Sequence, residues 1–553
     1  MMVASPTTLP LSVLAEVTRD RMTASTRNLV ILDPDTGEWG HVSWPEVHRR
    51  AEEIAATLLA EAVDDTPPVV ALFGHPTVDL AAAVQGTWLA GGAISILPGP
   101  VRGANEDRWS ETTIRRLAEL GTTRVLANGE QLALLADSDG CPALAPLATY
   151  GVGAIVDGPV GRRVDDRAPA VLQGTAGSTG EPKTAVLSTR AVLNNSRHLA
   201  QKFDAREERD VVFSWLPMYH DMGLAFLVAT MVTGVEFWVV PNSTFAAQPF
   251  KWLTWLTESK ATFTGAPDFA YALVGRFGHV FKSADLSHLR VAISGGEPID
   301  PDGYDRFIDG MDRFDFAPAA AAPAYGMAEA TCAVTMPDGG EGVRYDEVTV
   351  TPPEPGAEPR VRRYPLLGTP LEGMEVRIVP APDHAPVIDD RRVGLVEIRG
   401  TSMMNGYLGQ EPLAPDEWFP TGDIGYLVDG RLVVCGRAKE LVIVAGRNLF
   451  PVEIERAVAT VPGVRGGRVA AMGCGEGSNR PGLAIVAEYK GRKPDAARSA
   501  IMSAVASETG VVPSDVVLVG SGSLPITTSG KLRRLAIRDL LESGSLDEVG
   551  VAT

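Results

Sequence analysis

A short loop with the sequence TAGSTGEPK, from Thr175 to Lys183, brings together the residue types that bind phosphate. Gly177 and Gly180 allow the backbone to curl so that several N–H groups point at one anion. Hydroxyls and an ammonium group would complete this cradle, which comprises Thr175, Gly177, Ser178, Thr179, Gly180 and Lys183. Pro182 separates the last glycine from the lysine and disfavours the helix that follows a Walker A loop, so that class is excluded. Alone, the stretch also fits an ordinary Gly- and Ser-rich surface turn.

Four further stretches carry side chains that could do chemistry. They are SWLPMYHDMGL (214–224), AYGMAEAT (324–331), the segment from FPTGD to PVEIE (419–455) and LPITTSGKLRR (524–534). Each one taken singly is weak evidence, because a Tyr, Asp, Glu or Lys in such a loop is more often structural or solvated. Whether these side chains are functional depends on the helices and strands that position them.

Composition limits the classes of protein and of partner. The chain has 553 residues, 45% hydrophobic and 22% charged, so we expect two or more globular domains. A formal net charge of −19 argues against binding to nucleic acid and to anionic membrane surfaces. The four cysteines show no C-x-x-C spacing, and no apolar run is long enough for a membrane span, so we predict a cytoplasmic protein without a structural zinc site.

Short apolar runs alternate with amphipathic stretches over the first three hundred residues. This rhythm predicts parallel sheets with crossover helices, in which ligands bind beyond the carboxyl ends of the strands. Alternating strands then predict an antiparallel, β-rich subdomain between residues 371 and 445. The last hundred residues read as a compact α+β unit, and we place a domain junction near Cys435–Glu440.

In this order along nearly the whole chain, the five stretches resemble the adenylate-forming superfamily. SWLPMYHDMGL and GRNLFPVEIE are most similar to the fatty acyl-AMP ligase branch. The resemblance implies an acetyl-CoA synthetase-like α/β fold, with an N-terminal AMP-binding domain (1–436) and a small, mobile C-terminal lid domain (437–553). It also implies that the opening loop grips the β- and γ-phosphates of ATP.

The same resemblance assigns roles to the other clusters. Tyr325 would stack on adenine, Asp423 would accept both ribose hydroxyls with help from Arg437, and Glu329 would bind Mg²⁺. The nucleotide contacts implied in addition to the phosphate loop are Gly295, Gly296, Glu297, Tyr325, Gly326, Met327, Asp423 and Arg437.

Three further residues would act during the reaction. Lys531 would bridge the acyl carboxylate and the α-phosphate, neutralising the repulsion between the two anions. Lys439 matches the hinge about which the small domain rotates, and His220 would line the acyl pocket near the reacting carboxylate. The catalytic set is therefore Lys531, Glu329 and His220, with ATP and Mg²⁺ required.

The implied reaction activates a fatty acid as acyl-AMP and transfers it to the phosphopantetheine thiol of an acyl carrier protein. Coenzyme A as acceptor remains the alternative, as does a catalytically silent protein that only binds a nucleotide or a carrier. We expect the acyl pocket to draw on residues 222–228 and 270–277, and Asp268 leaves an amino-acid substrate open. Arginines in RVRRY (360–364) and KLRR (531–534) are candidates for a basic carrier-docking patch.

Overall fold

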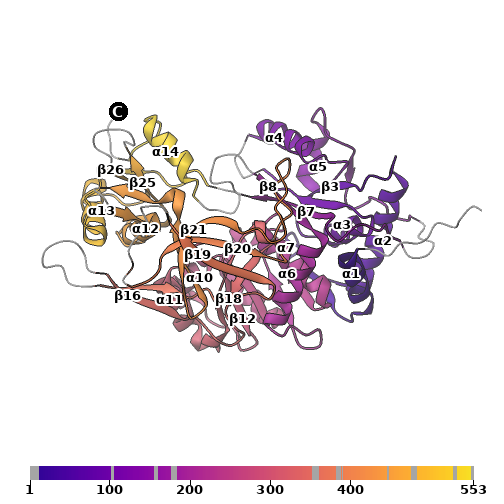
Figure 1. Cartoon of the computed structure of the whole chain (residues 1–553), viewed down its shortest axis with the longest axis horizontal. Coiled ribbons are helices and arrows are strands. Elements are labelled where there is room, and N and C mark those ends of the chain that lie inside the picture. Colours follow the sequence, from indigo (N-terminus) through magenta and orange to yellow (C-terminus); the bar gives the residue numbers. More distant parts are fainter. Residues whose placement is uncertain are drawn as a thin grey trace, which may run out of the picture.

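The computed structural model describes residues 12–100, 105–154, 160–175, 183–350, 360–381, 388, 390–444, 447–474, 482–526 and 532–549. Figure 1 shows an elongated molecule, with the helices nearest the N-terminus at one end and α12, α13 and α14 at the other. The predicted α/β architecture, with parallel and mixed sheets, a β-rich part and a C-terminal α+β unit, is confirmed, and two of the sheets are large.

A seven-stranded sheet carries part of the site at its carboxyl edge. Its order is β13-β12-β11-β9-β10-β1-β2, and only the β1–β2 pair is antiparallel. The strands are β1 (Asn28–Leu32), β2 (Trp39–Ser43), β9 (Val211–Ser214), β10 (Glu236–Val239), β11 (Phe263–Ala266), β12 (Val291–Ser294) and β13 (Ala321–Pro323). Most of these strands are buried apolar runs, as expected for a sheet covered on both faces.

A six-stranded sheet of order β6-β5-β3-β4-β7-β8 supplies the strands on both sides of the TAGSTGEPK loop. All neighbours are parallel except β7 and β8, where Thr175 pairs with Lys183. The strands are β3 (Val69–Phe73), β4 (Ala93–Ile96), β5 (Arg124–Ala127), β6 (Leu144–Pro146), β7 (Pro169–Thr175) and β8 (Lys183–Ser188). The loop therefore joins the two strands of an antiparallel pair.

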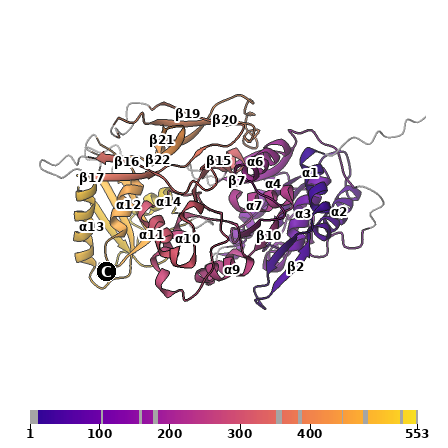
Figure 2. The same cartoon turned by 90° about the horizontal axis from the view of Figure 1, so that it is seen from below.

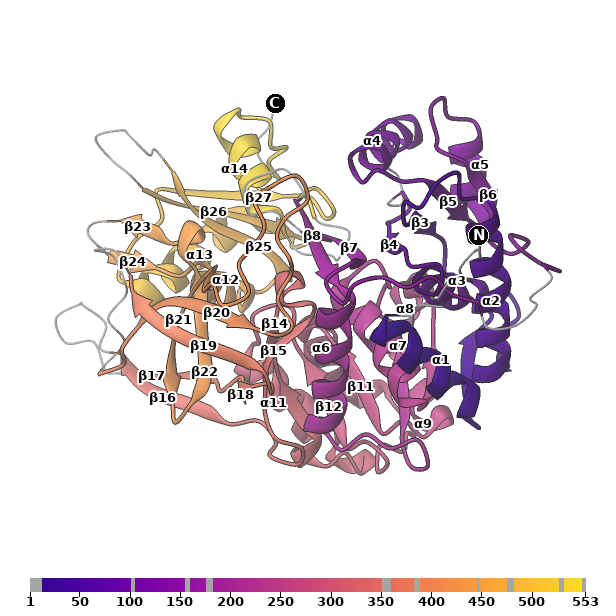
Figure 3. The same ribbon diagram turned by 45° about the vertical axis from the view of Figure 1, so that its right-hand side comes forward.

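Helices pack between and around the two sheets. Figure 3 shows α6 and α7 in the middle of the large part, with β7 and β8 above them and the label of β12 below. Helix α7 ends where Gly234 adopts φ +77°, a backbone conformation that other residues rarely adopt. The helices here are α1 (Val13–Ala24), α2 (Trp44–Ala60), α3 (Val78–Leu89), α4 (Glu106–Glu119), α5 (Gly129–Ala136), α6 (Thr189–Lys202), α7 (Asp221–Thr233), α8 (Asn242–Ala247), α9 (Trp252–Ser259), α10 (Asp268–Arg276) and α11 (Pro301–Met311).

The β-rich part lies along one side of the molecule, where Figure 2 places β19 to β22 opposite α9 and β2. Its antiparallel sheet contains β19 (Met374–Pro380), β20 (Gly394–Gly400), β21 (Phe419–Val428) and β22 (Arg431–Arg437). Smaller groups of strands are β14 (Tyr325–Gly326), β15 (Ala333–Met336) and β18 (Thr369–Pro370), and the hairpin of β16 (Tyr345–Val350) with β17 (Arg360–Pro365).

The residues after β22 form a hydrophobic core of their own. It is built from β23 (Val442–Val444), β24 (Arg447–Leu449), α12 (Pro451–Ala459), β25 (Val464–Cys474), β26 (Gly482–Tyr489), α13 (Pro494–Thr509), β27 (Asp515–Val519) and α14 (Arg534–Glu542). Phe450 departs from this pattern by packing with Cys435 and Tyr426 of the β-rich part. A boundary between residues 436 and 437 stays a prediction.

Short 3₁₀ helices complete the elements: η1 (Pro249–Lys251), η2 (Gly278–Val280), η3 (Asp312–Phe314), η4 (Pro318–Ala320), η5 (Ala328–Ala330) and η6 (Ala438–Glu440). No helix within the described ranges is both long and apolar enough to cross a membrane.

Candidate functional site

The predicted nucleotide residues gather where neighbouring parallel strands end. Gly295 and Gly296 directly follow β12, and Tyr325 follows β13, which pairs with β12 in parallel. The carboxyl ends of parallel strands share one edge of a sheet, so these loops come together there. Gly296 adopts φ +81°, and a Cβ on Gly295 would lie 3.1 Å from the carbonyl oxygen of Ala324. Both glycines therefore permit a backbone course that a larger residue would strain.

Tyr325 and Asp423 connect the large sheet to the β-rich part. The Tyr325 hydroxyl donates to Oδ2 of Asp423 at 2.5 Å, and Nε of Arg437 lies 3.4 Å from Oδ1. Asp423 and Arg437 are cross-strand partners on β21 and β22, so the sheet register sets their spacing. Burial raises the pKa of Asp423, while Arg437 and the Tyr325 hydroxyl oppose that rise. Three predicted nucleotide residues are thus brought together.

Glu329 lies in η5, in a sharply constrained loop. It is 8% exposed, and its backbone oxygen accepts from the amide of Met404 at 2.8 Å. Gly326 is obligatory in this loop, because a Cβ there would lie 1.9 Å from the carbonyl oxygen of Cys332. Thr331 adopts φ +70°, a rare conformation for a β-branched residue. The tight turn presents the Glu329 carboxylate from a fixed backbone.

Tyr407 joins Glu329 to the lysine of the opening loop. Its hydroxyl donates to Oε1 of Glu329 at 2.6 Å, and Nζ of Lys183 lies 4.6 Å from the centre of its ring. The chain around Tyr407 is fixed to β8, since Leu408 donates to the carbonyl of Thr184 at 2.9 Å. Sequence reasoning missed Tyr407, because a lone Tyr in MNGYLG looks like part of a turn.

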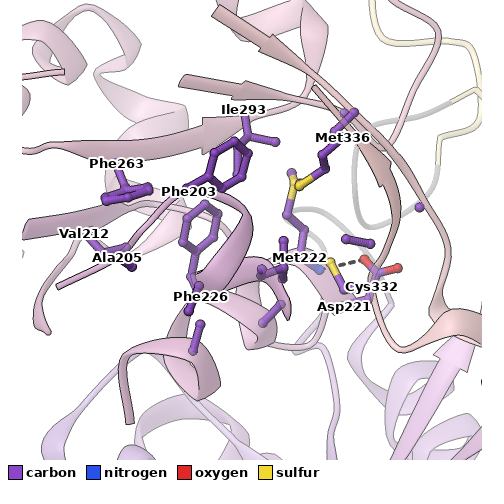
Figure 4. Close-up of a pocket in the computed structure, with 18 of the residues that line it drawn as sticks. Phe203, Ala205, Val212, Asp221, Met222, Phe226, Phe263, Ile293, Cys332 and Met336 are labelled. Atoms are coloured by element: carbon purple, nitrogen blue, oxygen red, sulfur yellow. Dashed lines mark hydrogen bonds between the residues drawn. The ribbon is translucent and has the colours of Figure 1, made fainter. Parts of the chain in front are cut away.

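An apolar cavity opens beside these residues, with an empty volume of about 900 Å³ including its mouth. Gly295, Gly296, Tyr325 and Gly326 line the end nearest the nucleotide residues. Figure 4 shows Asp221 and Cys332 on one side of the cavity and Phe263, Val212 and Ala205 on the other. The lining is almost entirely apolar, so the cavity suits a hydrocarbon chain rather than a charged ligand.

Comparison with known proteins assigns this arrangement to a family. The model of the family described as AMP-binding enzyme matches residues 19–408. The chain belongs to this AMP-binding enzyme family. Rv1013 of Mycobacterium tuberculosis is 35% identical over 513 residues, covering 89% of this chain and 93% of that protein. The long-chain-fatty-acid–AMP ligase FadD26 of the same species is 30% identical over 551 residues, covering 92% and 93%.

Solved structures agree with this assignment. A structure from a study of fatty acyl-adenylate ligases from E. coli and L. pneumophila superposes with a TM-score of 0.85 at 26% identity. The match covers 97% of this chain and 99% of that one, so the fold extends through the C-terminal unit. This AMP-binding enzyme therefore shares the complete architecture of adenylate-forming ligases.

Not every predicted residue of this AMP-binding enzyme can be placed. Gly177, Ser178, Thr179, Gly180 and Lys531 lie outside the described residues. The ends of the opening loop are described, and the Thr175 hydroxyl donates to the carbonyl of Lys183 at 3.3 Å. Lys439 is exposed on η6, immediately after β22.

His220 and Asp221 are neighbours in the sequence but differ in whether they line the cavity. His220 precedes α7, and its Nδ1 lies 3.9 Å from Oδ1 of Asp221. Asp221, rather than His220, is among the residues that line the cavity. The role of His220 in the acyl pocket stays a prediction, and Asp221 was not foreseen.

Residues 270–277, expected to contribute to the acyl pocket, do not line this cavity. Helix α10 does not line the cavity, because Tyr271 and Val274 pack into a separate core between α9 and α11. Asp268, at the start of α10, is also outside the cavity, and its Oδ2 accepts from the amide of Asp300 at 3.0 Å. It is therefore unable to bind an amino group on a ligand in that cavity.

Three arginines of the predicted basic docking patch form ion pairs with carboxylates of the same chain. Arg362 contacts Glu453 at 2.7 Å and Glu508 at 2.8 Å, both in the C-terminal unit. Arg363 pairs with two aspartates of α11, and Arg534 pairs with Glu440 and Glu455. These three arginines hold parts of the molecule together instead of forming an unpaired basic surface.

Glu329 is a suitable ligand for a hard cation that arrives with phosphate. Within the described ranges no three His, Cys, Asp or Glu side chains gather as a metal site would require. Mg²⁺ typically takes one or two protein carboxylates and completes its shell with nucleotide phosphates and water. A single buried carboxylate that Tyr407 links to Lys183 fits that mode of binding.

Proposed function

We propose that this protein activates a fatty acid as an acyl-adenylate and then transfers the acyl group to the phosphopantetheine thiol of an acyl carrier protein. The observation that carries the proposal is the apolar cavity lined at one end by Gly295, Tyr325 and Gly326, where the Tyr325 hydroxyl also binds Asp423. A carboxylate at the mouth of that cavity would face the α-phosphate of a nucleotide bound there. FadD26 bears the name of a long-chain-fatty-acid–AMP ligase, which agrees with a hydrocarbon occupant.

In the first step a carboxylate oxygen of the acid attacks the α-phosphorus of ATP. An O–P bond forms to give the mixed anhydride, and pyrophosphate leaves as the bond between the α- and β-phosphates breaks. Both reactants are anions, so the site must supply positive charge at the reacting atoms. We assign this role to Lys531, with Lys183 and the backbone of the opening loop holding the departing phosphates.

Glu329 would hold Mg²⁺ together with the phosphate oxygens, and the ion would supply charge neutralisation there. Asp423 would accept both ribose hydroxyls through its two carboxylate oxygens, while Arg437 opposes the rise in the pKa of Asp423 that burial causes. Oδ2 of Asp423 already accepts from the Tyr325 hydroxyl, so the tyrosine fixes the orientation of the carboxylate. The Tyr325 ring would then pack against adenine.

In the second step a thiol attacks the acyl carbonyl and AMP leaves, giving a thioester. The C-terminal unit would rotate about Lys439 between the steps, withdrawing Lys531 and admitting the thiol. A cytoplasmic location is part of the proposal, because both ATP and acyl carrier proteins would be available there.

Mass spectrometry of the products tests the proposal directly. The enzyme is incubated with ATP, Mg²⁺ and saturated acids of 8 to 20 carbons, with coenzyme A and a holo carrier protein offered side by side. We expect acyl-AMP with the acids alone and preferential loading of the carrier when both acceptors are present. Preferential loading of coenzyme A would refute the acceptor, and absence of both acyl-AMP and pyrophosphate would refute the activation.

A further inference from the structure

We propose that the adjacent rings of Phe203 and Phe263 form the end wall of the cavity and set the longest acyl chain that it accepts. The inference rests on the proposed function, because it takes the cavity to be the site of the fatty acid. Both rings line the cavity, at 4% and 6% exposure. Their centres are 6.2 Å apart and the rings meet edge to face.

The direction of the cavity follows from α7. Residues 221, 222, 225, 226, 229, 230 and 233 all line it, which is one face of the helix from its first residue to its last. Asp221 stands at the site end, beside the carboxyl ends of the strands, and Thr233 stands at the far end. Twelve steps at 1.5 Å give a length of roughly 18 Å along this face.

The rings lie at the far end from the nucleotide residues. Phe263 is the first residue of β11, and its parallel partner on β9 is Val212, which also lines the cavity. Phe203 immediately follows α6, which packs against α7. In Figure 4 Phe263 and Val212 lie on the opposite side of the cavity from Asp221. The cavity therefore begins at the carboxyl ends of the strands, and the two rings close it near their amino ends.

Arg290 supports this end wall from outside the cavity. Its guanidinium lies over the Phe263 ring, 5.1 Å from the centre, and Nη2 donates to the backbone oxygen of Phe203 at 3.1 Å. The charge is matched by Asp210, which is fully buried and lies 3.1 Å from Nε of Arg290. Arg290, paired with Asp210, thus contacts the ring of Phe263 and the backbone of Phe203, and so supports both parts of the wall.

The length of the cavity gives the expected limit. An extended hydrocarbon advances about 1.3 Å per C–C bond, given a bond length near 1.5 Å. A cavity of roughly 18 Å therefore accommodates about 14 bonds before the chain meets the two rings. Each methylene that cannot be accommodated costs about 10-fold or more in kcat/KM.

The test compares chain-length profiles of the full-length enzyme. Pyrophosphate release is measured for saturated acids of 8 to 20 carbons in the wild type and in Phe203→Ala and Phe263→Ala. Removing either ring should move the longest accepted acid upward by two to four carbons, and Phe203→Trp should shorten it. Phe203→Leu, a milder change, covers the case in which the alanine variant fails to fold.

Phe314→Ala is the matched control. Phe314 is also a buried phenylalanine with an arginine over its ring, Arg313 at 4.5 Å, but it lies in the core beside α11 and does not line the cavity. Its loss should lower stability without moving the profile. Unchanged profiles in the Phe203 and Phe263 variants, or an equal change in Phe314→Ala, would overturn the inference.

Calorimetric binding of the same acids separates this inference from the proposed function. If the wild type binds acids without forming acyl-AMP, the proposed function fails, and the shift in the binding limit still decides the role of the two rings. If no acid binds at any length, both proposals fall.

Discussion

Tyr407 donates a hydrogen bond to Glu329 at 2.6 Å while its ring lies against the ammonium group of Lys183. A proposed magnesium ligand and the lysine at the end of the proposed phosphate loop are thus coupled through one side chain. Burial, reinforced by the Glu329 carboxylate, raises the pKa of the Tyr407 hydroxyl, so the hydroxyl keeps its proton and stays a donor. Orientation of Glu329 is the function that this geometry supports for Tyr407.

Replacing Tyr407 by Phe should separate the two contacts. The ring and its contact with Lys183 remain, but Glu329 loses a hydrogen bond to a charged group, a change of about 1.5–3 kcal/mol. We expect the Mg²⁺ concentration needed for half-maximal pyrophosphate exchange to rise about tenfold or more. Calorimetric titration of Mg·ATP provides the second readout. An unchanged Mg²⁺ dependence would show that Glu329 needs no such support.

Asp423 offers a test of ribose recognition. In Asp423→Asn the amide retains one acceptor oxygen but loses the charge that pairs with Arg437, so we expect KM for ATP to rise roughly 10- to 100-fold. The wild type should discriminate against 2′-deoxy-ATP, and the variant should discriminate much less. Equal discrimination by both proteins would mean that Asp423 does not contact the 2′-hydroxyl.

Variants of Lys531 and Lys439 should be defective in different steps of the reaction. Lys531→Ala should lower acyl-AMP formation by a hundredfold or more, since neutralisation of the reacting anions is lost. Lys439→Pro should leave acyl-AMP formation intact and block thioester formation, because proline fixes φ at the hinge. Single-turnover assays of each step measure both. Loss of the same step in both variants would contradict the assignment.

The fold is well predicted from the sequence because short, local patterns of residue types indicate the helices and strands. Strand–helix alternation indicates the parallel sheets, and the last hundred residues indicate a separate α+β unit. The clusters around Tyr325 and Asp423 are also found from sequence, and the register of β21 with β22 explains why Arg437 accompanies Asp423.

What escapes prediction depends on distant segments meeting. Tyr407 gains its role only because its loop is bonded to β8 and lies beside η5, which no local pattern reveals. Phe203 and Phe263 are single aromatic residues at the ends of two elements, sixty positions apart in sequence. Helix α10 packs in a core and does not line the cavity, which its sequence could not reveal, because its apolar face is equally suited to a cavity or to a core.

Arg362 links the hairpin of β16 and β17 to the C-terminal unit. It contacts Glu453 and Glu508, and the Tyr364 hydroxyl donates to the other oxygen of Glu453 at 2.7 Å. Arg362→Gln should weaken this contact by about 1–3 kcal/mol, because two partly buried carboxylates lose their partner. We expect broader interdomain distances by single-molecule fluorescence. Arg399→Gln, which breaks an exposed pair with Glu375 within one sheet, is the control and should change nothing.

Asp268 should make stability depend on pH. Burial raises its pKa to about 8, although the hydrogen bond from the Asp300 amide lowers it. The charges of the nearby Glu297 and Asp300 add to the rise, and Arg456 opposes it. Tyr271 and Tyr304 also face it and stay protonated, since burial raises the pKa of both hydroxyls. The folded state therefore holds a proton that the unfolded state releases near the ordinary aspartate pKa of 3.8. The free energy of unfolding falls as pH rises from about 4 to about 8 and then levels off.

Asp268→Asn should remove this dependence while keeping an oxygen that accepts from the amide of Asp300. A pKa of about 8 in place of the ordinary 3.8 corresponds to an upper limit of roughly 6 kcal/mol. The unpaired amide group of the variant offsets about 1–3 kcal/mol of it. The variant should gain several degrees in Tm over the wild type at pH 8.5, and the gain should shrink toward pH 5. Asp309→Asn, an exposed position on the neighbouring α11, should give no such trend. A constant difference in Tm between pH 5 and pH 8.5 would mean that Asp268 is ionised throughout, and that Arg456 from the C-terminal unit neutralises it more strongly than its burial disfavours the charge.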